Sequence, residues 1–145
     1  MLRMARLTDY GILLLTTFAR EPDRTRSARE LAESSRLPRP TVSKILKDLA
    51  HHGLLVTHRG VKGGFSLSRP PADISVAEIV TALEGPIAVT ECSERNGSCR
   101  LEPTCIVRSN WRRINRVVLE ALEGITLDEM THPLAPADLP RTRHA

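Results

Sequence analysis

Aromatic residues are scarce in this chain of 145 residues, where Phe, Trp and Tyr together make up 3%. Surfaces that bind single-stranded nucleic acids stack bases on aromatic rings, so this scarcity argues against such a surface. No apolar run reaches the roughly 18 residues that a membrane-spanning helix needs. The apolar run at residues 11–19 is short and is followed by charged residues. We therefore expect a cytoplasmic protein that does not enter a membrane.

Cysteine is also rare, and its three copies all lie between residues 92 and 105. Gly97 and Pro103 interrupt regular structure in this stretch, so the thiols are expected on a loop. In the cytoplasm, clustered cysteines bind metal or sense redox state more often than they form structural disulfides. The pattern Cys92-x6-Cys99-x5-Cys105 is wider than the short Cys-x2-Cys knuckles of structural zinc sites, and thiolates also suit iron–sulfur clusters. Zinc and a metal-free thiol switch remain alternatives on this pattern.

Positive charge is unevenly distributed along the chain. Residues 1–70 contain 13 Lys and Arg against 6 Asp and Glu, whereas residues 71–145 contain 8 against 11. Because a basic surface attracts a polyanion, we expect only the first half to meet nucleic acid. The alternative is that these arginines are ordinary solvent-exposed residues.

Hydrophobic periodicity and helix-start signals predict a mainly helical fold with one β-hairpin. Helices are expected over residues 8–20, 27–34, 40–52, 75–85 and 105–123, and strands over residues 54–58 and 65–68. Capping boxes at Ser27–Glu30 and Ser75–Glu78 mark two of the helix starts. Gly53 is expected to end the third helix in a left-handed conformation.

The order of these elements is typical of a winged helix-turn-helix domain, in which two short helices precede a hairpin wing. We predict a DNA-binding domain at residues 1–86 and a cysteine loop that binds a cluster at residues 87–105. A dimerisation helix with a short following helix is predicted at residues 106–131, and a disordered tail at residues 132–145. The fold class is therefore mainly α with a small β wing and a long C-terminal dimerisation helix.

The third helix has an outward polar face that fits the major groove of double-stranded DNA. Candidate DNA contacts lie on this face, at its entrance, on the wing tip and on the second helix. They are Thr41, Ser43, Lys44 and Lys47 on the face, Arg39 at the entrance, Arg59 and Lys62 on the wing, and Ser27 and Arg29 on the second helix. The glycine-rich wing lacks the residue order of a nucleotide-binding phosphate loop. An alternative is a small helical domain whose third helix is basic for other reasons.

The last helix carries apolar residues in a 4-3-4-3 spacing, which is typical of a narrow coiled-coil seam. These residues are Val107, Trp111, Ile114, Val118 and Ala121. We expect the seam to pair two copies of the chain, which would set two recognition helices about 34 Å apart on DNA. The alternative is that the stripe packs against its own domain.

Several motifs resemble the IscR- and NsrR-type family of winged helix-turn-helix regulators, over residues 1 to about 130. The segments 6–10, 52–54 and 59–64 and the cysteine loop occur in the order of that family. Residues 105–115 and 122–127 are most similar to regulators of the SUF iron–sulfur assembly operon. The resemblance implies a homodimer that binds promoter operators and holds an iron–sulfur cluster, [2Fe–2S] with [4Fe–4S] as the alternative. It implies Cys92, Cys99 and Cys105 as ligands and cluster-assembly genes as targets.

Two features depart from the family pattern. Arg108 occupies the position at which the assembly-regulator branch has a histidine ligand, and a protonated guanidinium cannot coordinate a metal. The first cysteine spacing is one residue longer than the usual five. In the nitric-oxide-sensing branch an aspartate of the partner subunit ligates instead, and Asp9 occupies that place here. Asp9 is alternatively a carboxylate that stabilises the start of a helix.

The function predicted from these features is transcriptional regulation set by an iron–sulfur cluster. The alternative is a thiol-based, nitric-oxide-sensing or redox-stress-sensing regulator without a permanent cluster. An enzyme is not expected, because the five histidines show no spacing that pairs one of them with a cysteine as a nucleophile and its base.

Overall fold

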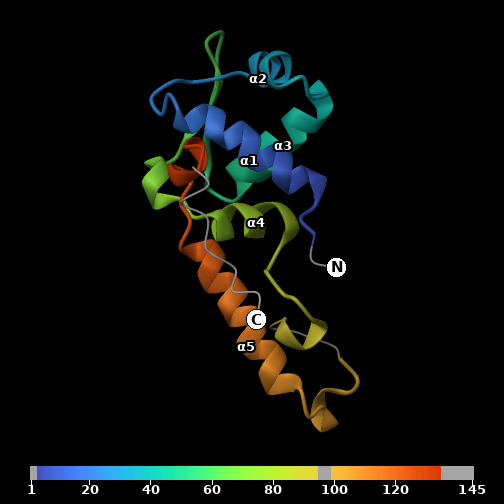
Figure 1. Cartoon of the computed structure of the whole chain (residues 1–145). Helices are drawn as coiled ribbons and strands as arrows, with labels where there is room; N and C mark the ends of the chain where they lie inside the picture. The colour runs from blue at the N-terminus through green and yellow to red at the C-terminus, as the bar shows by residue number, and fades with distance from the viewer. Residues whose placement is uncertain (1–2, 95–98, 135–145) are drawn as a thin grey trace.

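The computed structural model describes residues 3–94 and 99–134 of the chain (Figure 1). Its main elements are α1 (Arg6–Ala19), α2 (Ala28–Ser35), α3 (Arg39–His51), β1 (Leu55–His58), β2 (Gly64–Leu67), α4 (Val76–Glu84) and α5 (Arg108–Glu123). Short 3₁₀ turns are η1 (Pro71–Asp73), η2 (Glu91–Ser93), η3 (Glu102–Thr104) and η4 (Glu129–Thr131). The predicted helices and the hairpin are therefore confirmed.

The core is built mainly from aliphatic side chains that α1, α3 and α4 bring together. Its most completely buried members are Leu14, Leu15 and Phe18 of α1, Leu31 of α2, Val42, Ile45, Leu46 and Leu49 of α3, Ile74, Ile79 of α4, and Leu127. The predicted apolar stripe of α3 is thus fully buried, which turns the opposite face of α3 outward. Gly11 lets α1 pass close to α4, because a Cβ at this position would collide with the side chain of Leu83.

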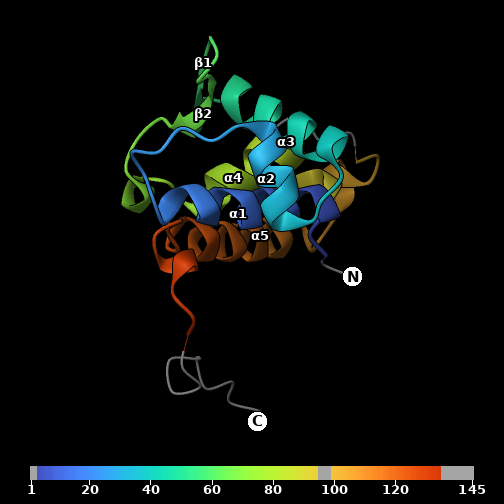
Figure 2. The ribbon, with the colours of Figure 1, turned by 90° about the horizontal axis from the view of Figure 1, so that it is seen from above.

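The wing is an antiparallel pair in which Leu55 lies opposite Leu67. The α1–α2 connection adds a short third strand position, since Arg26 and Phe65 exchange both backbone hydrogen bonds at 2.9 and 2.8 Å. Gly64 permits this close approach, because a Cβ there would collide with the Arg26 carbonyl oxygen. α3 and the wing consequently lie on the same side of α1 (Figure 2).

One predicted capping box is complete and the other is half formed. At the start of α4, the Ser75 hydroxyl accepts from the Glu78 N–H at 3.2 Å and the Glu78 carboxylate accepts from the Ser75 N–H at 2.9 Å. At the start of α2, Ser27 accepts from the Glu30 N–H at 3.1 Å, but the Glu30 carboxylate contacts Arg24 and Arg26 instead. The reciprocal bond predicted for Ser27 and Glu30 was therefore wrong, because two guanidinium groups compete for the same carboxylate.

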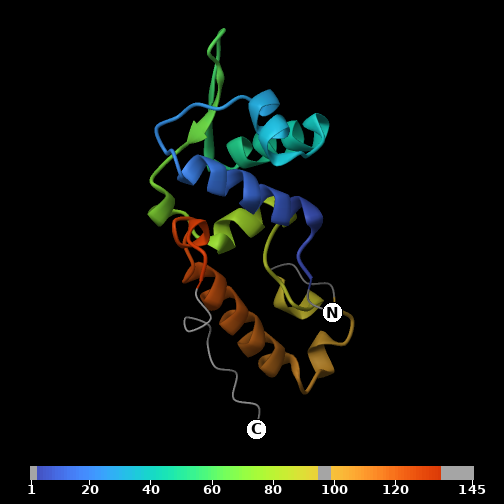
Figure 3. The ribbon, with the colours of Figure 1, turned by 45° about the horizontal axis from the view of Figure 1, so that its top comes forward.

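α5 begins three residues later than predicted, at Arg108, with Val107 as the residue before its first turn. Pro103 lies in the 3₁₀ turn η3, and the chain reaches helical geometry only after Cys105. α5 extends away from the end of the molecule that carries the wing (Figures 1 and 3). None of its residues is buried within the single chain.

No helix in residues 3–94 and 99–134 is both long and apolar enough to span a membrane. The predicted tail at residues 132–145 lies outside the described residues from residue 135 onward.

Candidate nucleic-acid interface and cysteine site

α2, α3 and the wing occupy one end of the molecule, with the wing tip at its extremity (Figures 1 and 3). On the outward face of α3, Lys44 and Lys47 are exposed, whereas Thr41 and Ser43 are half-buried. Arg39 is exposed at the first position of the helix. The structure therefore brings the predicted α3 residues to one surface.

Two of the predicted DNA contacts are held by acidic neighbours in the free chain. Lys44 forms an ion pair with Asp48 at 2.8 Å, and Arg29 forms one with Glu33 at 2.9 Å. The hydrogen bond to Glu33, together with its charge, raises the pKa of Arg29 above its ordinary value. Both pairs are solvent-exposed, so either carboxylate can be exchanged for a phosphate at little cost.

The wing tip presents Arg59 and Lys62, both exposed, on a tight turn. The turn closes with a hydrogen bond from the Gly63 N–H to the Gly60 carbonyl at 2.9 Å, and Gly60 has a φ of +106° that favours glycine. Among the described residues, Arg59, Lys62 and the α3 residue Lys47 form no ion pair. These cations are therefore available to phosphates.

Ser27 has a structural task at the start of α2 as well as a predicted DNA contact. Its hydroxyl oxygen accepts from the Glu30 N–H, which leaves its O–H free to donate. A hydroxyl at a helix N-terminus is well placed to donate to a phosphate oxygen, since the helix N-terminus itself favours negative charge.

The described part of the cysteine loop lies beside α5, away from the wing (Figure 1). Cys92 is buried within η2, with its Sγ 3.2 Å from the Thr90 hydroxyl, whereas Cys99 and Cys105 are half-buried. None of the three cysteines forms a disulfide. Across residues 3–94 and 99–134, no three Cys, His, Asp or Glu side chains converge as a ready-made metal site. The donors suit an iron–sulfur cluster in type, but the single chain does not pre-arrange them.

Two positions bear on the fourth ligand: Asp9, which is the predicted donor, and Arg108, which stands where the family pattern has a histidine. Asp9 is exposed in the first turn of α1 and does not join the cysteines within one chain. Arg108 opens α5, and its guanidinium is a hydrogen-bond donor and not a metal ligand. Neither residue therefore completes a metal site with the cysteines within the described part of the single chain.

The predictions from sequence did not include two polar side chains that hold the chain between the end of α4 and Cys92. Glu84, at the end of α4, accepts from the Ala5 N–H at 2.9 Å and from the Thr8 hydroxyl. Asn115 of α5 binds the backbone of Val89. A signal for Asn115 existed, because a polar residue spaced four positions from both Trp111 and Leu119 lies on an apolar helix face.

The predicted dimer seam leaves much apolar surface uncovered on the single chain. Val107, Trp111 and Ile114 are 43%, 37% and 43% exposed, and Ala121 is also exposed. Val118 is half-buried. Val117 was not among the predicted seam residues, but it is 59% exposed and widens the apolar stripe of α5.

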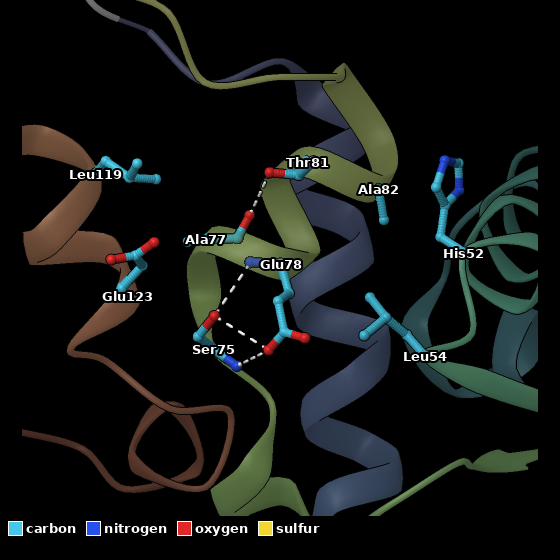
Figure 4. A pocket seen from close by; sticks show the side chains of 9 residues that line it. All are labelled: His52, Leu54, Ser75, Ala77, Glu78, Thr81, Ala82, Leu119 and Glu123. Carbon is cyan, nitrogen blue, oxygen red and sulfur yellow. Dashed lines mark hydrogen bonds between the residues drawn. The ribbon is translucent and has the colours of Figure 1, made fainter. Parts of the chain in front are cut away.

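A cavity of about 290 Å³ lies between the end of α3, α4 and α5 (Figure 4). Its central polar groups belong to the capping box of α4. Partial burial raises the pKa of Glu78, but hydrogen bonds from Ser75 and from the Arg69 guanidinium outweigh burial, and the net effect lowers this pKa. Ser75 and Glu78 hydrogen-bond to each other, and His52, Thr81 and Glu123 also line the cavity.

Comparison with known proteins shows which family shares these features. Residues 4–133 match the Rrf2 family, described as "Iron-dependent Transcriptional regulator". The HTH-type transcriptional regulator NsrR of Shouchella clausii is 27% identical over 131 residues, which cover 89% of this chain and 88% of that protein.

Solved structures of similar proteins share the fold. The structure of CymR, the global cysteine regulator of B. subtilis, has a TM-score of 0.71 at 26% identity and covers 90% of this chain and 97% of its own. The structure of T. potens IscR has a TM-score of 0.70 at 26% identity and covers 97% of this chain and 93% of its own. The chain therefore belongs to the Rrf2 family of transcriptional regulators, and its fold is their winged helix-turn-helix.

Proposed function

We propose that the chain acts as a homodimeric regulator whose affinity for promoter operators is set by an iron–sulfur cluster. The observation that carries this proposal is the cysteine loop, where the only three cysteines of the chain fall within residues 92–105 and form no disulfide. The iron-dependent description of the matching family supports it. Transcriptional regulation follows from the family, and the cluster, the dimer and the target genes are the proposed refinements.

In the DNA complex, α3 would enter the major groove and the wing would follow the phosphate backbone. Lys44, Lys47, Thr41 and Ser43 face the groove in this arrangement, so they would carry base recognition together with Arg39. Arg59 and Lys62 would neutralise phosphates, with Ser27 and Arg29 adding contacts from α2. This division assigns sequence preference to α3 and general affinity to the wing and α2.

The cluster would be held by thiolates of Cys92, Cys99 and Cys105, with [2Fe–2S] as the first choice and [4Fe–4S] as the alternative. Asp9 of the partner subunit is the proposed fourth ligand, since Arg108 cannot serve and Asp9 is exposed. A bound cluster would add charge to the loop, and oxidants or nitric oxide could remove the cluster. A carboxylate oxygen is a harder donor than a thiolate, so this ligand set would make removal easier.

The homodimer would form along α5. Val107, Trp111, Ile114, Val118 and Ala121 line the proposed seam, and the first three expose more than a third of their surface in one chain. Burying such a stripe against its twin removes apolar area from water and is the expected driving force. The target genes proposed from the motif resemblance are those for iron–sulfur cluster assembly.

The test is anaerobic purification of the unchanged protein, followed by absorption spectroscopy, iron and sulfide analysis, and operator binding. Cys99→Ser and Cys105→Ser should lose visible absorption, while Thr104→Ala changes the same loop without removing a thiol and should keep it. Asp9→Ala should lose the cluster faster in air than Asp23→Ala, which removes an exposed aspartate elsewhere. One zinc per chain, with operator affinity indifferent to iron, would sink the proposal.

A second candidate is a regulator that senses thiol chemistry without a permanent cluster. The likeness to CymR, named as a cysteine regulator, favours it. In that case, peroxide treatment of metal-free protein should form a disulfide that mass analysis detects under non-reducing conditions, with a matching change in operator affinity. Unchanged thiols after this treatment would exclude it.

A further inference from the structure

The segment that joins α4 to the cysteine loop is held at both of its ends. At the α4 end, Glu84 accepts from the Ala5 N–H at 2.9 Å and from the hydroxyl of Thr8, which is fully buried. Gly85 follows with a φ of +89°, and the chain turns toward α5. The α4 end is thus tied to the start of α1.

At the loop end, one amide of α5 binds the backbone on both sides of Ala88. The Asn115 Oδ1 accepts from the Val89 N–H at 2.8 Å, and its Nδ2 donates to the Ile87 carbonyl at 3.3 Å. These bonds span 26 and 28 positions of the chain. A side-chain amide offers an oxygen acceptor and two N–H donors, so this one residue can bind both a backbone N–H and a backbone carbonyl of the segment.

The backbone that Asn115 binds lies a few residues before the first cysteine. The Thr90 hydroxyl directly follows Val89 and contacts the Cys92 Sγ at 3.2 Å and the Ser93 hydroxyl at 2.9 Å. Cys92 is 7% exposed. A continuous series of contacts therefore runs from Asn115 on α5 to the Cys92 thiol.

We propose that Asn115 is a positioning residue that fixes the Cys92 side of the loop to α5 and couples the state of the loop to operator affinity. The coupling rests on the proposed function, whereas the positioning does not. α5 contributes the proposed seam on a neighbouring face, so a loop held to α5 moves with the dimer helix. A loop released from α5 can change its ligand set without moving the helix.

The test compares Asn115→Ala with Asn110→Ala on the same helix. Asn110 is exposed, and both substitutions raise helix propensity equally, so their difference isolates the two hydrogen bonds of Asn115. The first measurement is the iodoacetamide alkylation rate of each cysteine in reduced, metal-free protein, read by mass spectrometry. The second is hydrogen exchange of the Val89 amide.

Asn115→Ala should raise the Cys92 alkylation rate about tenfold over Asn110→Ala, since one to two net hydrogen bonds correspond to a factor of that order. Exchange at Val89 should rise in parallel, while Cys99 alkylation and the exchange of core amides stay within about twofold. A general loss of structure would accelerate all sites alike and would overturn positioning, as would unchanged Cys92 reactivity.

The coupling has its own measurement, the ratio of operator affinities of cluster-loaded and cluster-free protein. Asn115→Ala should bring this ratio at least threefold closer to one than Asn110→Ala does. A ratio of one in the unchanged protein refutes cluster control and leaves positioning to the alkylation result. A ratio that survives in Asn115→Ala, with Cys92 released, overturns the coupling alone.

Discussion

Arg26 and Arg24 bind the same two carboxylates but differ in burial, which makes them a matched pair. Arg26 contacts Glu21 and, at 3.1 Å, Glu30, while Arg24 contacts Glu21 at 3.0 Å and Glu30 at 2.7 Å. The Arg26 side chain is 11% exposed and that of Arg24 is 52% exposed. Arg26 also supplies the backbone that pairs with Phe65 of the wing.

Arg26→Ala removes two charge-assisted hydrogen bonds from a buried group. Such bonds contribute roughly 1.5–3 kcal/mol each, and we halve this because the Glu21 and Glu30 side chains are 50% and 37% exposed and remain hydrated. The expected loss in the free energy of unfolding is therefore about 2 kcal/mol, or a fall in Tm of roughly 6 °C. Arg24→Ala should cost no more than about 0.5 kcal/mol, as is usual for exposed pairs.

Urea and thermal unfolding followed by circular dichroism measure these losses directly. Operator affinity at fixed salt is the functional assay, and both substitutions remove one positive charge, so the general electrostatic effect on DNA binding cancels between them. We expect Arg26→Ala to bind the operator more weakly than Arg24→Ala, because the α1–α2 connection that pairs with Phe65 of the wing would be held less firmly. If the two substitutions lowered the free energy of unfolding equally, the buried Arg26 would not be the main stabilising partner of Glu21 and Glu30.

The remaining predictions concern the DNA surface, the dimer and the response to acid. Lys44→Ala should weaken binding to the operator more than to unrelated DNA, whereas Arg59→Ala should weaken both alike and reduce the salt slope by about one unit in titrations at several salt concentrations. Equal effects of Lys44→Ala on all sequences would contradict the groove assignment. Ile114→Glu should leave the melting temperature of the single chain nearly unchanged but shift sedimentation toward a monomer, because this side chain is 43% exposed in one chain. Partial burial opposes ionisation of Glu78, but its hydrogen-bonding partners prevail and hold its pKa below the ordinary 4.5. Its contribution to stability is present above pH 4.5 and is lost as the pH falls through the lower folded-state value, so Glu78→Gln should flatten the decline of unfolding free energy in that acidic range.

Local patterns predicted the helices well because their causes are local. The α3 stripe of Val42, Ile45, Leu46 and Leu49 repeats at helical spacing, and all four side chains are buried. The Ser75–Glu78 box formed as expected, since both partners lie within one turn. Spacing of this kind depends on neighbouring residues alone, so no knowledge of the fold was needed.

The predictions that failed involve competition from another part of the chain. Glu30 was expected to cap Ser27, but Arg26, positioned by its pairing with Phe65, takes part of its carboxylate. The start of α5 was predicted at Cys105, although the turn containing Pro103 delays it to Arg108. Propensity indicates what a segment can form, and tertiary contacts decide between the options.

The candidate site divides along the same line. The cysteines and the basic residues of α3 and the wing could be predicted as site residues because their chemistry is visible in residue type and spacing, and their roles stay predictions. Glu84 and Asn115 could not be predicted, since their partners lie 76 to 79 and 26 to 28 positions away. Such pairings need the packing of α1 and α5 against α4 and its following segment, which no short window of sequence contains.

Those two side chains bear on how a distant loop can influence α3. The described part of the cysteine loop lies beside α5, whereas α3 and the wing lie at the other end of the molecule (Figure 3). Any coupling within one chain therefore has to pass through the packed elements between them. Glu84 ties the end of α4 to the start of α1, and at Gly11 a Cβ would meet both Leu83 of α4 and, at 3.5 Å, Ile45 of α3. The missing side chain of Gly11 therefore lets α4 and α3 both pack closely against α1 at this position. We expect a shift of α4 at this point to displace α3 together with its outward face, because packed interiors transmit strain.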